Sequence, residues 1–131
     1  IYYKRVYFCS MNKIELYFRA TLFSFGMIIA TMIHATFGLC TFFLPWKIRY
    51  QFITLWSRFI IFWLKLTCNI HYQVEGLAHL PKNRNAIILS KHQSTWETLA
   101  FQIIFPPQTW VLKKELLNVP FFGWALRLLE P

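Results

Sequence analysis

The longest feature of the hydrophobic pattern is an uninterrupted apolar segment in the first third of the chain. Residues 20–44 contain no Lys, Arg, Asp or Glu. A helix rises about 1.5 Å per residue, so roughly 20 such residues cross the hydrocarbon core of a bilayer. A secretory signal has a shorter apolar core of about 7–15 residues, whereas this segment ends in an interface-like border, Pro45-Trp46-Lys47. The pattern predicts a membrane helix, with a cleaved signal as the alternative.

A single histidine, His34, lies within this apolar segment. An intramembrane histidine marks a proton path when an acidic partner accompanies it. The segment contains no acidic residue, so we expect a neutral imidazole packed against another helix.

A second, shorter apolar stretch covers residues 52–66 and is interrupted by Arg58 and Lys65. Their spacing of seven positions puts both on one helical face. This predicts a helix in the membrane interface whose basic side chains reach the headgroups, with a buried core helix as the alternative. Basic residues flank the first segment on both sides, so the positive-inside rule gives no orientation. A two-helix hairpin that enters and leaves on the same membrane face would explain this symmetry.

The pattern changes at Cys68, after which short apolar runs alternate with helical periodicity. The expected strands are 70–74, which alternates apolar and polar residues, and the apolar runs 85–90 and 109–112. The expected helices are 96–105 and 120–129, with a short helix or turn at 113–118. This order predicts an α/β fold with a partly parallel sheet. We therefore expect an N-terminal membrane-associated helical region, 1–67, and an α/β domain, 68–131, incomplete at its C-terminus.

Composition narrows the classes of partner. The 131 residues are 56% hydrophobic and 20% aromatic, and 14 basic against 5 acidic residues give a net charge of +9. Such a chain binds nucleic acid, or an anionic lipid surface or phosphorylated substrate. The long apolar segments favour lipid and argue against nucleic acid. Cys9, Cys40 and Cys68 lack metal-ligand spacing, so we expect reduced structural cysteines.

The candidate chemistry lies in residues 90–98, between an expected strand and an expected helix. His92 is the best general base available, because its unperturbed pKa is about 6.5. A carboxylate from Glu97 would fix the imidazole tautomer and stabilise its cation. Five positions along a helix turn roughly 140° away from the same face. The two can meet only if His92 precedes the first turn, with Ser94 or Thr95 as N-cap.

A simpler interpretation of the same residues is structural. Glu97 follows Ser94 by three positions, the spacing of a capping box, and His92 would then be a turn residue. A nucleophilic role for Ser94 is disfavoured because the sequence lacks a Gly-x-Ser-x-Gly turn.

Two motifs resemble those of the glycerolipid acyltransferase family. Residues 85–98 are similar to the first motif, His-x-x-x-x-Asp, with Glu97 in place of Asp, as in a variant of some bacterial members. The second motif has Lys, two residues, Leu, six residues and Gly, and Lys113, Leu116 and Gly123 match it. The third, Glu-Gly-Thr-Arg, does not occur before Pro131. We therefore expect a fragment, inactive in isolation.

The resemblance implies acyl transfer from acyl-CoA or acyl carrier protein to the 2-hydroxyl of 1-acylglycerol 3-phosphate (lysophosphatidate), without a metal or cofactor. His92 and Glu97 would be catalytic. Lys113 would bind the substrate phosphate, with Lys91 and Lys114 as weaker candidates. We include Gly123 among the substrate-site residues but expect it to permit close packing. The expected partners are membrane lipids, the acyl donor and lysophosphatidate, with no nucleic acid.

Other functions remain open at this point. The acceptor could be glycerol 3-phosphate or another lysophospholipid, or the chain could be a non-catalytic membrane lipid-binding protein. The expected location is the bacterial inner membrane, with the catalytic domain facing the cytoplasm.

Overall fold

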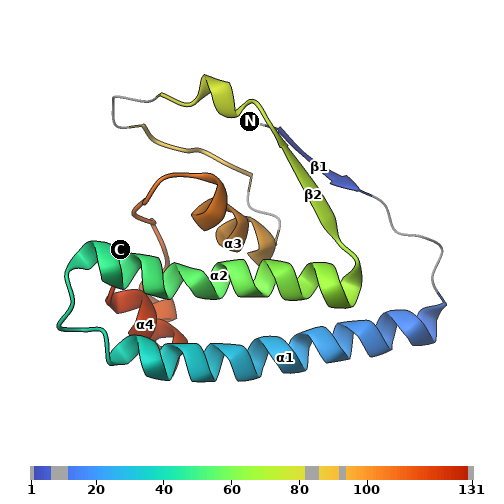
Figure 1. The fold of residues 1–131 in the computed structure, drawn as a ribbon, viewed down its shortest axis with the longest axis horizontal. Helices are drawn as coiled ribbons and strands as arrows, with labels where there is room; N and C mark the ends of the chain where they lie inside the picture. The colour runs from blue at the N-terminus through green and yellow to red at the C-terminus, as the bar shows by residue number, and fades with distance from the viewer. Residues whose placement is uncertain (1, 7–11, 82–85, 92–93, 130–131) are drawn as a thin grey trace.

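The computed structural model describes residues 2–6, 12–81, 86–91 and 94–129. In chain order the elements are β1 (Tyr2–Val6), α1 (Lys13–Leu39), α2 (Trp46–Cys68), β2 (His71–Glu75), the short 3-10 helix η1 (Leu77–His79), α3 (Thr95–Ile104), the 3-10 helix η2 (Lys114–Asn118) and α4 (Phe122–Arg127). Two long helices, α1 and α2, form the base of the molecule; α3 lies on α2, α4 lies beside both long helices, and β1 and β2 extend away from the end of α2 (Figure 1).

Helices α1 and α2 run antiparallel as a hairpin (Figure 1). The turn between them begins where Thr41 donates its hydroxyl to the Gly38 carbonyl at 2.6 Å, and Pro45 starts α2 from an extended conformation. A proline suits a helix start because it lacks an N–H that the first turn would leave unpaired. At the other end α2 stops at Asn69, which adopts the left-handed conformation common at helix C-termini. The structure thus shows a two-helix hairpin, and its entry into and exit from one membrane face stays a prediction.

The two hairpin helices are joined by side chains that cross between them. The Trp56 indole N–H donates to the Thr31 hydroxyl at 3.0 Å. His34 Nε2 lies 2.8 Å from the Phe52 carbonyl oxygen, and the imidazole stacks on the Phe52 ring with centroids 4.7 Å apart. The expected packing of His34 against a neighbouring helix is confirmed.

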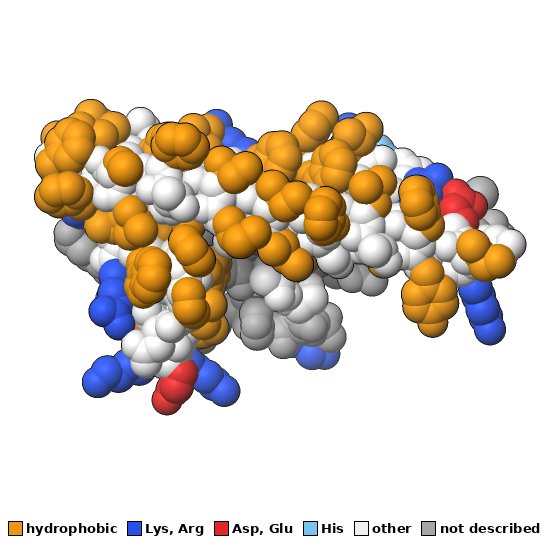
Figure 2. Space-filling view, turned by 90° about the horizontal axis from the view of Figure 1, so that it is seen from below, with side chains coloured by type: hydrophobic (Ala, Val, Ile, Leu, Met, Phe, Trp, Pro, Cys, Tyr) orange, Lys and Arg blue, Asp and Glu red, His pale blue; other side chains and the backbone are white. Residues whose placement is uncertain are grey.

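The outer face of α1 is almost entirely apolar. Figure 2 shows hydrophobic side chains along the length of this helix, with basic side chains at the edges of the view. The exposed large hydrophobic residues include Ile14, Tyr17, Phe18, Phe25, Ile28, Ile33 and Phe37. Helix α1 is long and apolar enough to cross a membrane, and little of it is buried inside the protein. This supports the predicted membrane helix. The observed helix, Lys13–Leu39, begins and ends earlier in the chain than the predicted segment 20–44.

Helix α2 is amphipathic and forms the centre of the molecule. It lies between α1 on one side and α3 on the other (Figure 1). Its buried face includes Tyr50, Ile53, Ser57 and Ile60, whereas Arg58 and Lys65 are exposed, as predicted. Helix α2 also has an exposed apolar stripe, whose residues are three, four or seven positions apart: Ile48, Leu55, Phe59, Phe62 and Leu66. Helix α2 therefore combines a core face with an apolar outer face.

The strand content differs from the prediction. Strand β2 confirms the expected strand at 70–74 and alternates exposed and half-buried residues, and it pairs antiparallel with β1 so that Val6 faces His71. The apolar runs 85–90 and 109–112 were predicted wrongly as strands, because their described parts are irregular; residues 86–90 are exposed, and 109–112 alternate exposed and half-buried positions. Ile87, Leu89 and Val111 are 90%, 92% and 106% exposed.

The failure of those two strands has a physical cause. An apolar run becomes a buried strand only when a neighbouring strand supplies hydrogen bonds and another layer covers its faces. In the described ranges the sheet consists of β1 and β2 alone, with antiparallel pairing. The described residues therefore do not confirm a partly parallel α/β layer. The other expected elements are present as α3, η2 and α4.

Candidate active site

The N-terminus of α3 is closed by a capping box. The Ser94 backbone N–H donates to Glu97 Oε2 at 2.8 Å, and the Ser94 hydroxyl donates to the same oxygen at 3.1 Å. The Trp96 N–H in turn donates to the Ser94 hydroxyl oxygen at 3.3 Å. The structural interpretation of the Ser94–Glu97 spacing is confirmed. Ser94 is the N-cap, which is one of the two arrangements that would place His92 ahead of the first turn.

Glu97 is a buried carboxylate, with only 3% of its surface exposed. It lies in the first helical turn, where the positive end of the helix dipole favours an ionised carboxylate. A carboxylate has two oxygens and accepts several hydrogen bonds, so a capping role and an imidazole partner are compatible. His92 lies outside the described residues. Its pairing with Glu97 therefore stays a prediction.

Helix α3 is seated on α2 and β2 through apolar contacts. Leu99 packs with Ile60 and Ile61 of α2 in one buried cluster. Trp96, next to Glu97, meets Tyr72 of β2 edge to face, with ring centroids 5.3 Å apart. Aromatic pairs of this geometry are favourable beyond the apolar area they bury. Glu97 is thus positioned by the hairpin and β2 together.

The second motif folds into η2 and α4, which pack closely at Gly123. A Cβ added at Gly123 would lie 2.5 Å from the carbonyl oxygens of both Leu116 and Leu117. Only glycine allows the two backbones to approach this far. Packing alone therefore accounts for glycine at this position, and a substrate contact stays a prediction.

Helix α4 packs against α1 and also reaches side chains in the first half of α2. The Phe122 ring lies 5.8 Å from the Trp56 ring, and the Trp46 indole donates to the Leu129 carbonyl at 3.4 Å. Leu129 also packs with Tyr50 and completes a small buried cluster. Helix α3 packs on α2, whereas α4 packs on α1 and touches α2, so the hairpin as a whole supports both motif-bearing helices.

The three candidate phosphate-binding lysines are exposed. Lys91 follows the irregular 86–90 segment, whereas Lys113 and Lys114 start η2. In the ranges that the structure describes, none of the three forms an ion pair, and no group of three His, Cys, Asp or Glu side chains gathers at one place. The positions of the lysines suit contact with a ligand from solvent, and their role in binding phosphate stays a prediction.

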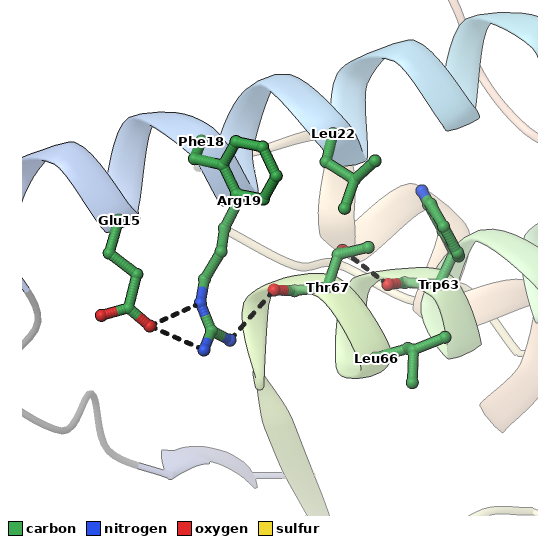
Figure 3. A pocket seen from close by; sticks show the side chains of 7 residues that line it. All are labelled: Glu15, Phe18, Arg19, Leu22, Trp63, Leu66 and Thr67. Atoms are coloured by element: carbon green, nitrogen blue, oxygen red, sulfur yellow. Dashed lines mark hydrogen bonds and ion pairs between the residues drawn. The ribbon is translucent and has the colours of Figure 1, made fainter.

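A groove opens between the start of α1 and the end of α2 (Figure 3). Its volume of about 490 Å³ is within the range of small-ligand sites, and most of its lining is apolar, including Phe18, Leu22 and Trp63. Arg19 forms the polar part, donating to Glu15 at 2.7 and 3.0 Å and to the Thr67 carbonyl at 3.2 Å. This Arg19–Glu15 pair is neutral overall.

Comparison with known proteins identifies the part of the chain that carries both motifs. The profile of a family described as Acyltransferase matches residues 71–130. This segment belongs to the acyltransferase family. The match begins at β2 and includes α3, η2 and α4, so it confirms the resemblance drawn from the two motifs. We call residues 71–130 the acyltransferase segment.

Two curated relatives are similar over longer parts of the chain. One is a 1-acyl-sn-glycerol-3-phosphate acyltransferase of Pseudomonas aeruginosa, 51% identical over 89 residues, which cover 67% of this chain and 34% of the relative. The other, of the same name, is from Saccharomyces cerevisiae and is 38% identical over 66 residues, or 50% of this chain and 22% of the relative. The chain thus spans about a third or less of these relatives. No solved structure matches it significantly.

Proposed function

We propose that the acyltransferase segment belongs to an enzyme that acylates the 2-hydroxyl of 1-acylglycerol 3-phosphate and so forms phosphatidate. The observation that carries this proposal is the position of Glu97, a buried carboxylate at the start of α3, five residues after His92 in the first motif. The names of the two relatives support the acceptor. The acyl donor is a thioester, on coenzyme A or acyl carrier protein, and no metal or other cofactor takes part.

The reaction needs one base and one leaving group. The acceptor oxygen attacks the thioester carbonyl while His92 removes the hydroxyl proton, so that an ester bond forms and the thioester bond breaks. The imidazolium then returns the proton to the departing thiolate. Glu97 fixes the imidazole tautomer and stabilises its charge during the step.

The substrate phosphate needs a cation close to the reacting hydroxyl. We assign this role to Lys113, with Lys91 and Lys114 as weaker candidates. A lysine ammonium is a compact charge that suits phosphate, and the net charge of +9 favours an anionic acceptor.

The acyl chains require access to the membrane. The apolar outer face of α1 supports a membrane location. We propose that the motif helices lie at the bilayer surface. We assign the protein to the bacterial inner membrane, with α3 and α4 on the cytoplasmic side, where acyl thioesters are available.

The test is acyl transfer from labelled acyl-CoA or acyl carrier protein to lysophosphatidate, with the full-length protein in membranes. His92→Ala is expected to lower turnover by a factor on the order of 10² or more. His79→Ala, an exposed histidine in η1, is the matched control and should retain activity.

Two outcomes would contradict the proposal. Full activity in folded His92→Ala protein would remove the proposed base. No phosphatidate from the wild type with either donor would favour another acceptor or a non-catalytic lipid-binding protein, for which the capping box explains Glu97 without catalysis.

A further inference from the structure

One polar contact is buried in the otherwise apolar interface between α2 and α3. The Ser57 hydroxyl on α2 donates to Gln102 Oε1 on α3 at 2.5 Å. Ser57 is 0% exposed, as are Ile60 on α2 and Ala100 on α3. A hydroxyl in such surroundings needs a partner, because a buried unpaired polar group is costly.

We propose that Ser57 and Gln102 are positioning residues that set the rotation and axial position of α3, and through it the location of Glu97. This inference rests on the proposed function of the acyltransferase segment. Apolar contacts between α2 and α3, such as Ile60 with Leu99, accompany this bond. Apolar contacts are non-directional and tolerate small rotations, whereas a hydrogen bond weakens steeply when its distance or angle changes.

The geometry of α3 transmits this constraint to the site. Gln102 and Glu97 belong to one uninterrupted helix of 10 residues, so they move together. The side chains of a helix extend to a radius of about 5–6 Å, so a rotation of about 10° moves them by about 1 Å. A displacement of about 1 Å in a catalytic group can reduce turnover by a factor of about 10².

A second contact holds the opposite end of α3. Trp96 meets Tyr72 of β2 near the helix start, whereas Gln102 meets Ser57 near the helix end. The aromatic pair limits tilting but is apolar, whereas the Ser57–Gln102 bond supplies a directional contact between α2 and α3. Ser57 does not touch the reacting atoms and acts only through α3.

The experiment compares four variants of the full-length protein in lipid vesicles. Ser57→Ala and Gln102→Met each remove one partner, and the double variant removes both polar groups from the interface. Thr54→Val is the matched control, because this buried α2 hydroxyl bonds only to carbonyls of its own helix, those of Tyr50 and Gln51. Thermal unfolding and the kcat and KM for lysophosphatidate acylation are measured for each.

The double variant distinguishes positioning from stability. With no polar group left unpaired, its Tm should return to near that of the wild type. If the bond positions α3, kcat stays lowered by roughly tenfold or more while KM changes little. Thr54→Val should retain its kcat.

Wild-type kcat in the double variant would overturn the inference, because the bond would then serve stability alone. If the double variant fails to fold, the kcat of Gln102→Met decides instead. Gln102 is only half-buried, so this single substitution should be tolerated by the fold. Absence of acylation in the wild type would be a different result. It would remove the proposed function, and the positioning role with it.

Discussion

Ser94 and Glu97 bind each other through two hydrogen bonds at the start of α3, both to Glu97 Oε2. The pair closes the helix and holds the carboxylate in a buried position, five residues after His92 in the first motif. One side chain thus has a demonstrated structural role and a proposed catalytic one. Substitutions that affect the two roles unequally can separate them.

Replacing Ser94 should mainly lower stability, whereas replacing Glu97 should mainly lower turnover. Ser94→Ala removes the N-cap side chain and should lower the free energy of unfolding by about 1 kcal/mol, with little change in turnover. Glu97→Gln keeps the size and one acceptor oxygen but removes the charge that stabilises an imidazolium, so turnover should fall by a factor on the order of 10². Thermal unfolding and steady-state kinetics of both variants provide the measurement. Equal losses of turnover in the two would show that Glu97 matters only as a cap.

Gly123 should be intolerant of even one added carbon. Gly123→Ala places a Cβ against two backbone carbonyls of η2, which cannot move aside as a side chain can. We expect a loss of about 1–3 kcal/mol in the free energy of unfolding, as for overpacked cores.

Gly38→Ala is the control for Gly123→Ala. A Cβ at Gly38 would lie 3.8 Å from Ile53 Cγ1, an ordinary contact, and alanine favours a helix over glycine by roughly 1 kcal/mol. This variant should be as stable as the wild type or more so. Equal effects of the two substitutions on Tm would contradict the packing role assigned to Gly123.

Lys113 should affect substrate binding more than the chemical step. If its ammonium holds the phosphate equally in the ground state and the transition state, Lys113→Ala raises KM for lysophosphatidate, on the order of tenfold, and leaves kcat nearly unchanged. Lys114→Ala, the adjacent exposed lysine, is the control and should change KM less. A larger effect at Lys114 would reverse the assignment, and no effect at either would direct attention to Lys91.

The helices could be predicted from the sequence, because their signals are local. The charge-free segment 20–44 identified α1, and Ser94 with Glu97 marked the start of α3. The runs 85–90 and 109–112 were misread because a buried strand depends on partners that no local pattern reveals.

The Ser57–Gln102 contact gave no sequence signal at all. It joins two neutral side chains 45 positions apart, and neither residue type is distinctive within its helix. Only the packing of α3 on α2 brings them together. By contrast, the His34 environment could be anticipated, because an apolar helix with no acidic residue leaves a histidine few partners other than a neighbouring helix.

The outer face of α1 should determine membrane binding. Phe25 lies near the middle of this helix and is 65% exposed. Phe25→Arg would put a charge among lipid tails, at a cost of about 2.5–3.5 kcal/mol at a helix centre. We expect a large loss of flotation with lipid vesicles. Leu77→Arg makes the same kind of change at an exposed residue of η1, away from the hairpin, and should float as the wild type does. If Phe25→Arg floats normally while Leu77→Arg does not, the membrane-facing surface lies on the side of η1, and the apolar face of α1 has another partner.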